Sequence, residues 1–314
     1  MAPEMLLDQV KEGIPFSSVP SQRYEYSNLG YGLLGQVVSI VSAMPFQEYI
    51  SRYILEPLGM ENTLWEYSEA PDKLLALGYK WEEGKWILQP MLNDGAFGAM
   101  GGLITSIADF RKYVSLHLSA WPPRNDPDNG PLKRSSLREM HRMHNPRFSS
   151  DPERFGGNSQ SLIAGYGYGL RILKDQEGVL EVGHNGGLPG FGSSYVFYPE
   201  HGIGIMAFGN LTYAGGLVKS ANNKLIESLM EQGLFNPRIL SLSPILDKRK
   251  EQVAELILNW DPKLEEEIVA ANLYLDISRE ARMDEARNLL EQCGDIVSVE
   301  PVDPENQLRG SFLM

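Results

Sequence analysis

The stretch GHNGGLPGFGSSYVFYPEHGIGIMAFGN, residues 183–210, is the part of the sequence that most restricts the fold. Its two β-rich runs, SSYVFY and GIGIMAF, are separated by the turn residues PEHG. The runs GYGYGLRIL and VLEVGH come before them, with the turn residues KDQEG in between. Connections this short join antiparallel strands, because a parallel crossover needs about a dozen residues or more. The sequence therefore predicts an antiparallel meander after about residue 160.

Helical patterns lie on both sides of this meander. Apolar residues recur at helical spacing over residues 30–41, and a second helix is indicated over about 46–60. Ser106 and Asp109 form a capping box that opens a third helix, and a long helix is predicted over about 215–234. We therefore expect an α+β fold, in which a helical subdomain packs on an antiparallel β-sheet flanked by helices.

Composition excludes several classes of function. The net charge is −13, from 28 basic and 41 acidic residues, which argues against nucleic acid and anionic membranes as partners. The single cysteine, Cys293, excludes an internal disulfide and a cysteine-based metal site. No apolar run reaches about eighteen residues, and the N-terminal sequence lacks signal-peptide features, so we expect no membrane span and a cytoplasmic chain as given.

The sequence indicates no cofactor. His141 and His144 in HRMH have a spacing compatible with metal binding on a helix, but the neighbouring sequence supplies no cysteine and, apart from Glu139, no carboxylate to support such a site. Isolated histidine pairs of this kind are usually surface residues. We expect neither a metal nor another cofactor.

Two short stretches are unusual, and each has a structural and a functional interpretation. In YEYSN, residues 24–28, Asn28 could simply start the helix with Tyr26 packed beneath it, because asparagine is a good N-cap. In the second stretch, His184 is followed by Asn185, Gly186 and Gly187. This is either a tight hairpin turn or a strand edge whose N–H groups are open to a ligand, because no side chains guard it.

Together the two stretches resemble one family. Tyr26-Ser27-Asn28 resembles the Y-x-N motif of the serine β-lactamase and penicillin-binding-protein-like hydrolases, in their class C-like esterase and D-peptidase branch. His184-Asn185-Gly186 resembles the H-x-G that replaces K-T-G in many members of that branch. The neighbouring stretches YSNLGYGLLGQVV, PLGMENT, GAMGGLITSIADFRKYV and HNGGLPGFGS follow in the order of the family. The resemblance covers about residues 5–235.

The resemblance implies roles for the matching residues. Tyr26 would handle a proton during acyl transfer, and His184 would border the pocket and hydrogen-bond Tyr26 or the substrate. Asn28 and the stretch Asn185–Gly187 would contact the substrate, with the N–H of Gly187 as one of two oxyanion donors. One such donor is worth roughly 3 kcal/mol of transition-state stabilisation. Histidine is largely neutral near pH 7, so we expect small-molecule ester, peptide or amide substrates rather than β-lactams.

One feature of the family is absent from the sequence. The nucleophile of the family is the serine of an S-x-x-K motif, and no serine in the 314 residues has a lysine three positions later. We therefore expect an N-terminally incomplete hydrolase that is inactive alone. The alternative is a pseudoenzyme that keeps the cleft for binding or protein interaction. A weaker alternative uses Ser193 or Ser194 as the nucleophile.

The extent of the resemblance and the change of sequence pattern along the chain divide it into two regions. We assign residues 1–240 to the hydrolase region, with a helical part over about 1–160 and a sheet part over about 161–240. Residues 241–314 are charged and helical in pattern, and we assign them to a tail or a linker to a further domain. The sequence leaves the oligomeric state open, and a homo-oligomer is one alternative.

Overall fold

The structure is a computed structural model that describes residues 3–71, 74–124, 126–151, 160–238, 240–294 and 296–314. It divides into two compact units, the first made of residues 1–121 and 125–238 and the second of residues 122–124 and 239–314. This division concerns contacts alone. The functional assignment of residues 1–240 and 241–314 stays a prediction.

The centre of the first unit is a six-stranded antiparallel sheet with the strand order β3-β4-β5-β6-β7-β8. Its strands are β3 (His144–Asp151), β4 (Gln160–Gly167), β5 (Leu170–Asp175), β6 (Leu180–Leu188), β7 (Phe191–Tyr198) and β8 (Ile203–Gly209). Each strand pairs with the next strand in the sequence, as short hairpin connections require. The predicted antiparallel meander is therefore confirmed.

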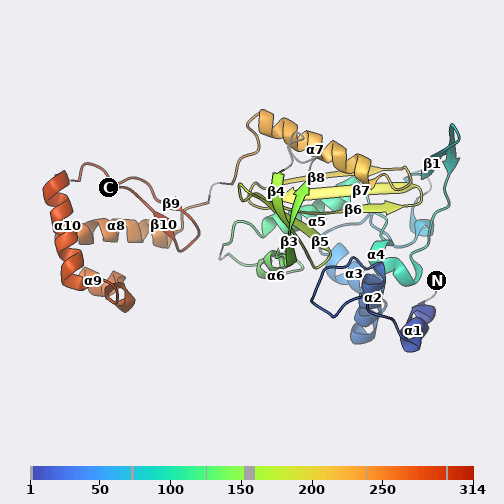
Figure 1. The fold of residues 1–314 in the computed structure, drawn as a ribbon, viewed down its shortest axis with the longest axis horizontal. Helices are drawn as coiled ribbons and strands as arrows, with labels where there is room; N and C mark the ends of the chain where they lie inside the picture. Colours follow the sequence, from blue (N-terminus) through green and yellow to red (C-terminus); the bar gives the residue numbers. More distant parts are fainter. Residues whose placement is uncertain (1–2, 72–73, 125, 152–159, 239, 295) are drawn as a thin grey trace. The chain divides into compact units, whose positions relative to one another are not determined.

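Helices cover both faces of this sheet, because successive side chains of a buried strand point to opposite sides. On β7, Phe197 packs with Val114 of helix α5 (Ile107–Ser119). Its neighbours Val196 and Tyr198 pack with Ile226 of helix α7 (Gly215–Glu231). Figure 1 shows α7 lying along one face of the sheet. The predicted α+β fold, with an antiparallel sheet flanked by helices, is confirmed.

The remaining helices of the first unit form the helical subdomain. They are α1 (Pro3–Glu12), α2 (Asn28–Ser42), α3 (Phe46–Ile50) with the π-turn η1 (Ser51–Leu55), α4 (Gly98–Gly101) and α6 (Arg134–Met140), with 3-10 turns η2 (Tyr67–Glu69) and η3 (Gly95–Phe97). Helix α2 packs against α3 and α4. Among the described residues no single helix reaches the length and apolarity of a bilayer span, and only the pair Asn28–Ser42 and Phe46–Leu55, bent by 80°, does so jointly.

The caps of two helices differ in detail from their prediction. Ser106 caps α5 as expected, because its hydroxyl accepts from the N–H of Asp109 at 3.2 Å. The Asp109 carboxylate, only 1% exposed, instead accepts from the N–H of Asn62 at 2.7 Å and the hydroxyl of Thr63 at 3.0 Å. It joins the helix to the loop that follows η1. In α2 the N-cap is Ser27 rather than Asn28, which is the first residue of the helix.

In the first unit, three strands and one turn were missed from the sequence. The hairpin of β1 (Tyr79–Glu82) and β2 (Lys85–Leu88) is mostly exposed, so its pattern lacks a buried face. Strand β3 was missed as well. The run GYGYGLRIL is not one strand, because Tyr168 and Gly169, with φ of 51° and 86°, form a turn between β4 and β5.

The second unit is largely helical, as its charged pattern predicted. It contains α8 (Pro244–Asn259), α9 (Pro262–Ile268), the 3-10 turn η4 (Ala271–Tyr274), α10 (Arg279–Cys293) and the short pair β9 (Asp303–Pro304) and β10 (Gly310–Ser311). The buried carboxylate of Glu265 accepts from Nε and Nη2 of Arg279, at 2.7 and 2.6 Å, and this joins α9 to α10.

Candidate active site

The start of α2 brings Tyr26 to the sheet. Ser27 has an extended backbone and caps the helix through a 3.0 Å hydrogen bond from the N–H of Gly30. Tyr26 therefore stands outside the helix and is 56% exposed, so it does not pack beneath it. Its ring stacks on the ring of His184 with centroids 6.0 Å apart and an interplanar angle of 28°. Two stretches that lie 158 positions apart in the sequence thus meet.

His184 is held in one tautomer by its hydrogen bonds. Its Nδ1 lies 2.7 Å from the carbonyl oxygen of Asn185, and a carbonyl can only accept, so Nδ1 carries the proton. Nε2 is therefore an acceptor, and it accepts a hydrogen bond from the hydroxyl of Tyr166 at 3.0 Å. Burial lowers the pKa of His184, and the charge of Arg171 lowers it further, against the hydrogen bond to Asn185. The ring is neutral near pH 7.

Tyr166, on β4, is a site residue that the sequence reasoning missed. It takes the position at Nε2 of His184 where we expected Tyr26 or the substrate. Burial, together with the neighbouring tyrosine hydroxyls, raises the pKa of Tyr166, so its phenol keeps its proton and remains a donor. The only sequence signal was its place in the run GYGYG, which was interpreted as strand.

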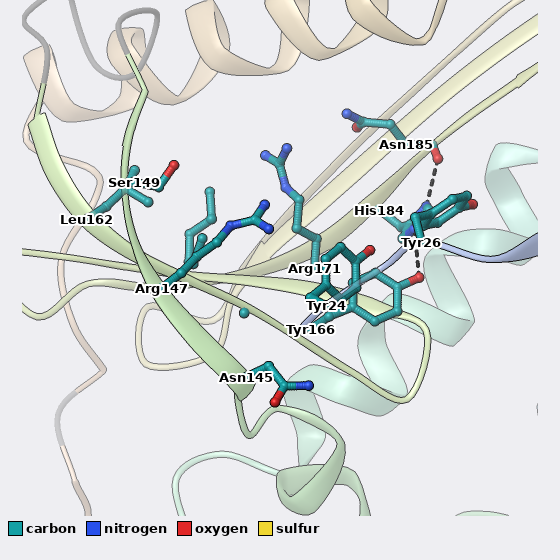
Figure 2. A pocket seen from close by; sticks show the side chains of 13 residues that line it. Tyr24, Tyr26, Asn145, Arg147, Ser149, Leu162, Tyr166, Arg171, His184 and Asn185 are labelled. Atoms are coloured by element: carbon teal, nitrogen blue, oxygen red, sulfur yellow. Dashed lines mark hydrogen bonds between the residues drawn. The ribbon is translucent and has the colours of Figure 1, made fainter. Parts of the chain in front are cut away.

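A cavity of about 370 Å³ lies beside this pair. The sheet contributes side chains of β3, β4, β5 and β6, and the segment before α2 contributes Tyr24 and Tyr26. Figure 2 shows Tyr26 beside His184 at one end, with Arg147 and Ser149 toward the other. The cavity is lined by Tyr24, Tyr26, Asn145, Arg147, Ser149, Leu162, Ala164, Gly165, Tyr166, Arg171, Leu173, His184 and Asn185.

The structure brings some of the predicted substrate-binding residues to this cavity and leaves others outside its lining. Asn185 lines it, whereas the exposed Asn28 does not. Gly186 packs inward, because a Cβ there would collide with the hydroxyl of Ser193. Gly187 is exposed, and a Cβ on it would come within 3.0 Å of the ring of Tyr213.

Strand β6 offers an open backbone edge next to the cavity. Within the described part of the chain, β5 pairs with β6 only as far as Gly183, opposite Arg171. Beyond that residue β6 pairs with β7 alone, from His184 to Leu188. Unpaired N–H and C=O groups on a strand edge can bind an extended ligand. The edge that we expected from the glycine-rich sequence is thus present.

The serines considered as alternative nucleophiles are poorly placed. Ser194 is 2% exposed, and its hydroxyl accepts from the amide of Asn222 on α7 at 3.2 Å. Ser193 packs against Gly186. Neither lines the cavity.

The two histidines of HRMH do not share a helix. His141 is the C-cap that follows α6, and His144 begins β3. Across the described ranges, no group of three or more His, Cys, Asp or Glu side chains is arranged to hold a metal ion. His141 instead binds the buried His117, with Nε2 of His141 and Nδ1 of His117 2.9 Å apart, and accepts from the indole N–H of Trp121 at 3.0 Å.

Comparison with known proteins gives consistent results. The family model described as Beta-lactamase matches residues 5–228. Protein flp of Staphylococcus aureus (strain MW2) is 25% identical over 237 residues, which are 74% of this chain and 41% of that protein. The beta-lactamase of Yersinia enterocolitica is 23% identical over 230 residues, 67% of this chain and 56% of that protein.

Solved structures show the same likeness. The octameric penicillin-binding protein homologue from Pyrococcus abyssi has a TM-score of 0.56 and 27% identity, over 72% of this chain and 48% of that one. The D-stereospecific amidohydrolase from Streptomyces has a TM-score of 0.54 and 23% identity, over 71% and 60%. This chain therefore spans less than two thirds of the length of these relatives.

Proposed function

The chain belongs to the beta-lactamase family, and we propose on that premise that its cleft serves a serine hydrolase reaction, acyl transfer from esters or small peptides and amides to water. The observation that carries the proposal is the stacking of Tyr26 on His184 at the cavity, beside the open edge of β6. A proton-handling phenol and open strand N–H groups are two of the parts that acyl transfer needs.

The electrostatics of the site favour neutral acyl groups at the end of the cavity that Tyr26 and His184 line. His184 is neutral there, with its Nε2 occupied by the Tyr166 hydroxyl, so it supplies no fixed positive charge. A lysine at the same place would carry such a charge and attract a carboxylate. We therefore propose esters or amides rather than β-lactams as the compounds that react beside Tyr26.

The nucleophile is the part that these 314 residues do not supply. They contain no Ser-x-x-Lys, and Ser193 and Ser194 do not line the cavity. A hydroxyl is a weak nucleophile unless an adjacent base activates it. We therefore propose that this chain does not turn substrate over by itself.

Hydrolysis assays test the proposal in two steps. The purified chain should hydrolyse p-nitrophenyl acetate no faster than buffer does, and a fluorophosphonate should not label it with time. A fusion in which a Ser-x-x-Lys segment of the kind that the family resemblance implies precedes the chain should gain activity. In that fusion Tyr26→Phe should lower kcat by about 100-fold or more, because the proton transfer is lost.

The matched control for that variant is Tyr53→Phe, which removes a hydroxyl from an exposed tyrosine that does not line the cavity. Its activity should equal that of the unaltered fusion. Turnover by the chain alone, with a labelled serine after repurification, would contradict the missing nucleophile. Equal activity of the Tyr26→Phe fusion would contradict the role of Tyr26.

A binding function without catalysis is the second candidate. It is favoured by the cavity itself, which this chain forms from its own residues in the absence of a Ser-x-x-Lys motif. A fusion that binds N-acetyl-D-phenylalanine amide but never hydrolyses it would support this candidate over the enzyme.

We also propose self-association. The Pyrococcus abyssi relative is octameric, and helix α2 of this chain presents apolar side chains to solvent. Large exposed apolar patches are typical of protein interfaces.

A further inference from the structure

Tyr213, in the loop between β8 and α7, has a conformation that is unfavourable for an aromatic residue. Its φ of 52° lies in the left-handed region, which a bulky side chain adopts only under constraint. Its side chain is 66% exposed, so burial does little to offset the strain. Strain of this kind is concentrated at active sites and ligand sites. The role of Tyr213 therefore lies outside the packing of the core.

The loop that carries Tyr213 is held in place on both sides of it. The N–H of Thr212 donates to the carbonyl oxygen of Tyr79 on β1 at 2.8 Å. The hydroxyl of Thr212 accepts from the N–H of Gly190, in the turn between β6 and β7, at 2.8 Å. On the other side Ala214 is buried, with 6% of its surface exposed. These contacts fix the backbone around Tyr213 and leave its side chain at the surface.

Tyr213 lies against the last residues of β6. Its N–H donates to the carbonyl oxygen of Leu188 at 3.2 Å. Its ring packs over Gly187, since a Cβ on that glycine would lie 3.0 Å from Cδ1 of the ring. Gly187 is itself exposed and belongs to the part of β6 that pairs with β7 alone. The ring therefore stands beside the open edge at its end farthest from His184.

Most of the Tyr213 side chain remains accessible beside this edge. The neighbours that it meets on β6, Gly187 and Leu188, carry no charge, which suits an uncharged group of a ligand. An extended ligand on a strand edge directs its side groups toward the walls of that edge. Aromatic rings pack against one another in stacked or edge-to-face arrangements, and these add to the free energy of burial.

We propose that Tyr213 is a specificity-determining residue that binds an aromatic group of the ligand beside the open edge of β6. The proposal rests on the proposed function above, in which the N–H of Gly187 receives the reacting carbonyl. Because the ring of Tyr213 packs on Gly187 itself, the aromatic group must lie within a few bonds of that carbonyl. The substrates are then esters or amides that carry a neutral aromatic group next to the reacting carbonyl.

A binding experiment tests this subsite without any need for turnover. The probes are N-acetyl-D-phenylalanine amide and N-acetyl-D-leucine amide, titrated into the full chain by calorimetry. Both are neutral and apolar, and only the first carries an aromatic ring. The phenylalanine amide should bind about fivefold more tightly, because its ring packs on that of Tyr213.

Two variants of Tyr213 separate its ring from its hydroxyl. Tyr213→Phe keeps the ring and should keep the preference for the phenylalanine amide. Tyr213→Asn removes the ring and should reduce the preference to less than about twofold. Asparagine adopts the left-handed conformation more readily than tyrosine, so this variant should melt at the same temperature as the unaltered chain or above it. A purely structural role of Tyr213 would instead lower the melting temperature.

The matched control is Tyr168→Asn in the turn between β4 and β5. Tyr168 is 60% exposed and has a φ of 51°, so it shares both the exposure and the backbone conformation of Tyr213. Its ring packs beside His144 of β3, with centroids 5.8 Å apart, and it does not line the cavity. The control should keep the full preference for the phenylalanine amide.

The NMR signal of the Gly187 amide separates this subsite from the proposed function. It should shift with both ligands, because each places a carbonyl at the edge. A shift with both ligands but equal affinity for them, or a preference that survives Tyr213→Asn, would overturn the subsite and leave the edge intact. A preference that Tyr213→Asn abolishes, without any shift of Gly187, would support the aromatic contact and contradict the proposed position of the carbonyl. Failure of both ligands to bind would overturn both.

Discussion

The hydroxyl of Tyr166 on β4 donates its hydrogen bond to Nε2 of His184 on β6, across a distance of 3.0 Å. Because the Nδ1–H of His184 is directed at the carbonyl oxygen of Asn185, this bond stabilises the neutral ring. A residue outside both recognised motifs thus adds to the effect of burial on the protonation of the site.

Replacing Tyr166 should therefore change the titration of His184. In Tyr166→Phe, Nε2 loses its donor and accepts a proton more readily, so the lowered pKa of His184 should rise toward the ordinary histidine value. NMR titration of the ring protons of His184 measures this. Tyr168→Phe, in the adjacent turn, should leave the titration unchanged. A fall in the His184 pKa in Tyr166→Phe would show that the bond has the opposite direction.

The buried pair of His117 and His141 should make stability dependent on pH. Burial lowers the pKa of His117 to about 3 and that of His141 to about 4, with smaller effects from His141 and Arg138 respectively. Both are below the ordinary value of 6.5, so the unfolded chain binds protons first. The free energy of unfolding is therefore highest above about pH 6.5. It declines as the pH falls toward 4, by about 1.4 kcal/mol per pH unit for each histidine.

Urea unfolding at a series of pH values checks this dependence. Removing one titrating group in His117→Phe should flatten the profile between about pH 6.5 and 4, although it lowers the stability at neutral pH. His144→Gln, on the exposed start of β3, should keep the full slope. The same slope in His117→Phe as in the unaltered protein would exclude His117 as its source.

Asp109 should be among the most sensitive positions of the helical subdomain. Its buried carboxylate accepts from Asn62, Thr63 and the ammonium of Lys112, the last at 3.0 Å. Asp109→Ala leaves these donors without their acceptor and should lower the free energy of unfolding by about 3 kcal/mol. The exposed Asp284→Ala should have almost no effect. Denaturant unfolding compares the two, and similar values would contradict the role of Asp109.

The apolar surface of α2 should govern self-association. Its side chains at helical spacing are 52–81% exposed: Leu34, Val37, Ile40 and Val41. Val37→Glu with Val41→Glu should shift the chain toward the monomer, as measured by sedimentation equilibrium, because burying these charges in an interface is unfavourable. Val297→Glu, at an exposed position of the second unit, should not. An assembly unaffected by the double variant must use another surface.

The sequence predicted the parts of this molecule that follow from local periodicity and recognisable motifs. The meander from β5 to β8 and helices α2, α5 and α7 were expected, and so was a meeting of Tyr26 with the stretch at His184. The sequence did not indicate Tyr166 beside His184 or Tyr213 beside Gly187. Their positions depend on strand register across β4, β5 and β6 and on the loop that follows β8, and strand β3 was missed. Side-chain partners across a sheet depend on register, which a single strand does not reveal.

The neighbour-to-neighbour order of the sheet has a consequence for the kinetics of folding. Each pairing from β3 to β8 joins strands adjacent in the chain, so the sheet needs only short loops to close. The contact between Tyr26 and His184 closes a far longer loop, and such closures are entropically unfavourable until other contacts support them. We expect the sheet to form first and the cleft last during refolding. In pulse-labelling hydrogen exchange, amides of β6 and β7 should gain protection before those of α2, and the reverse order would contradict this sequence of events.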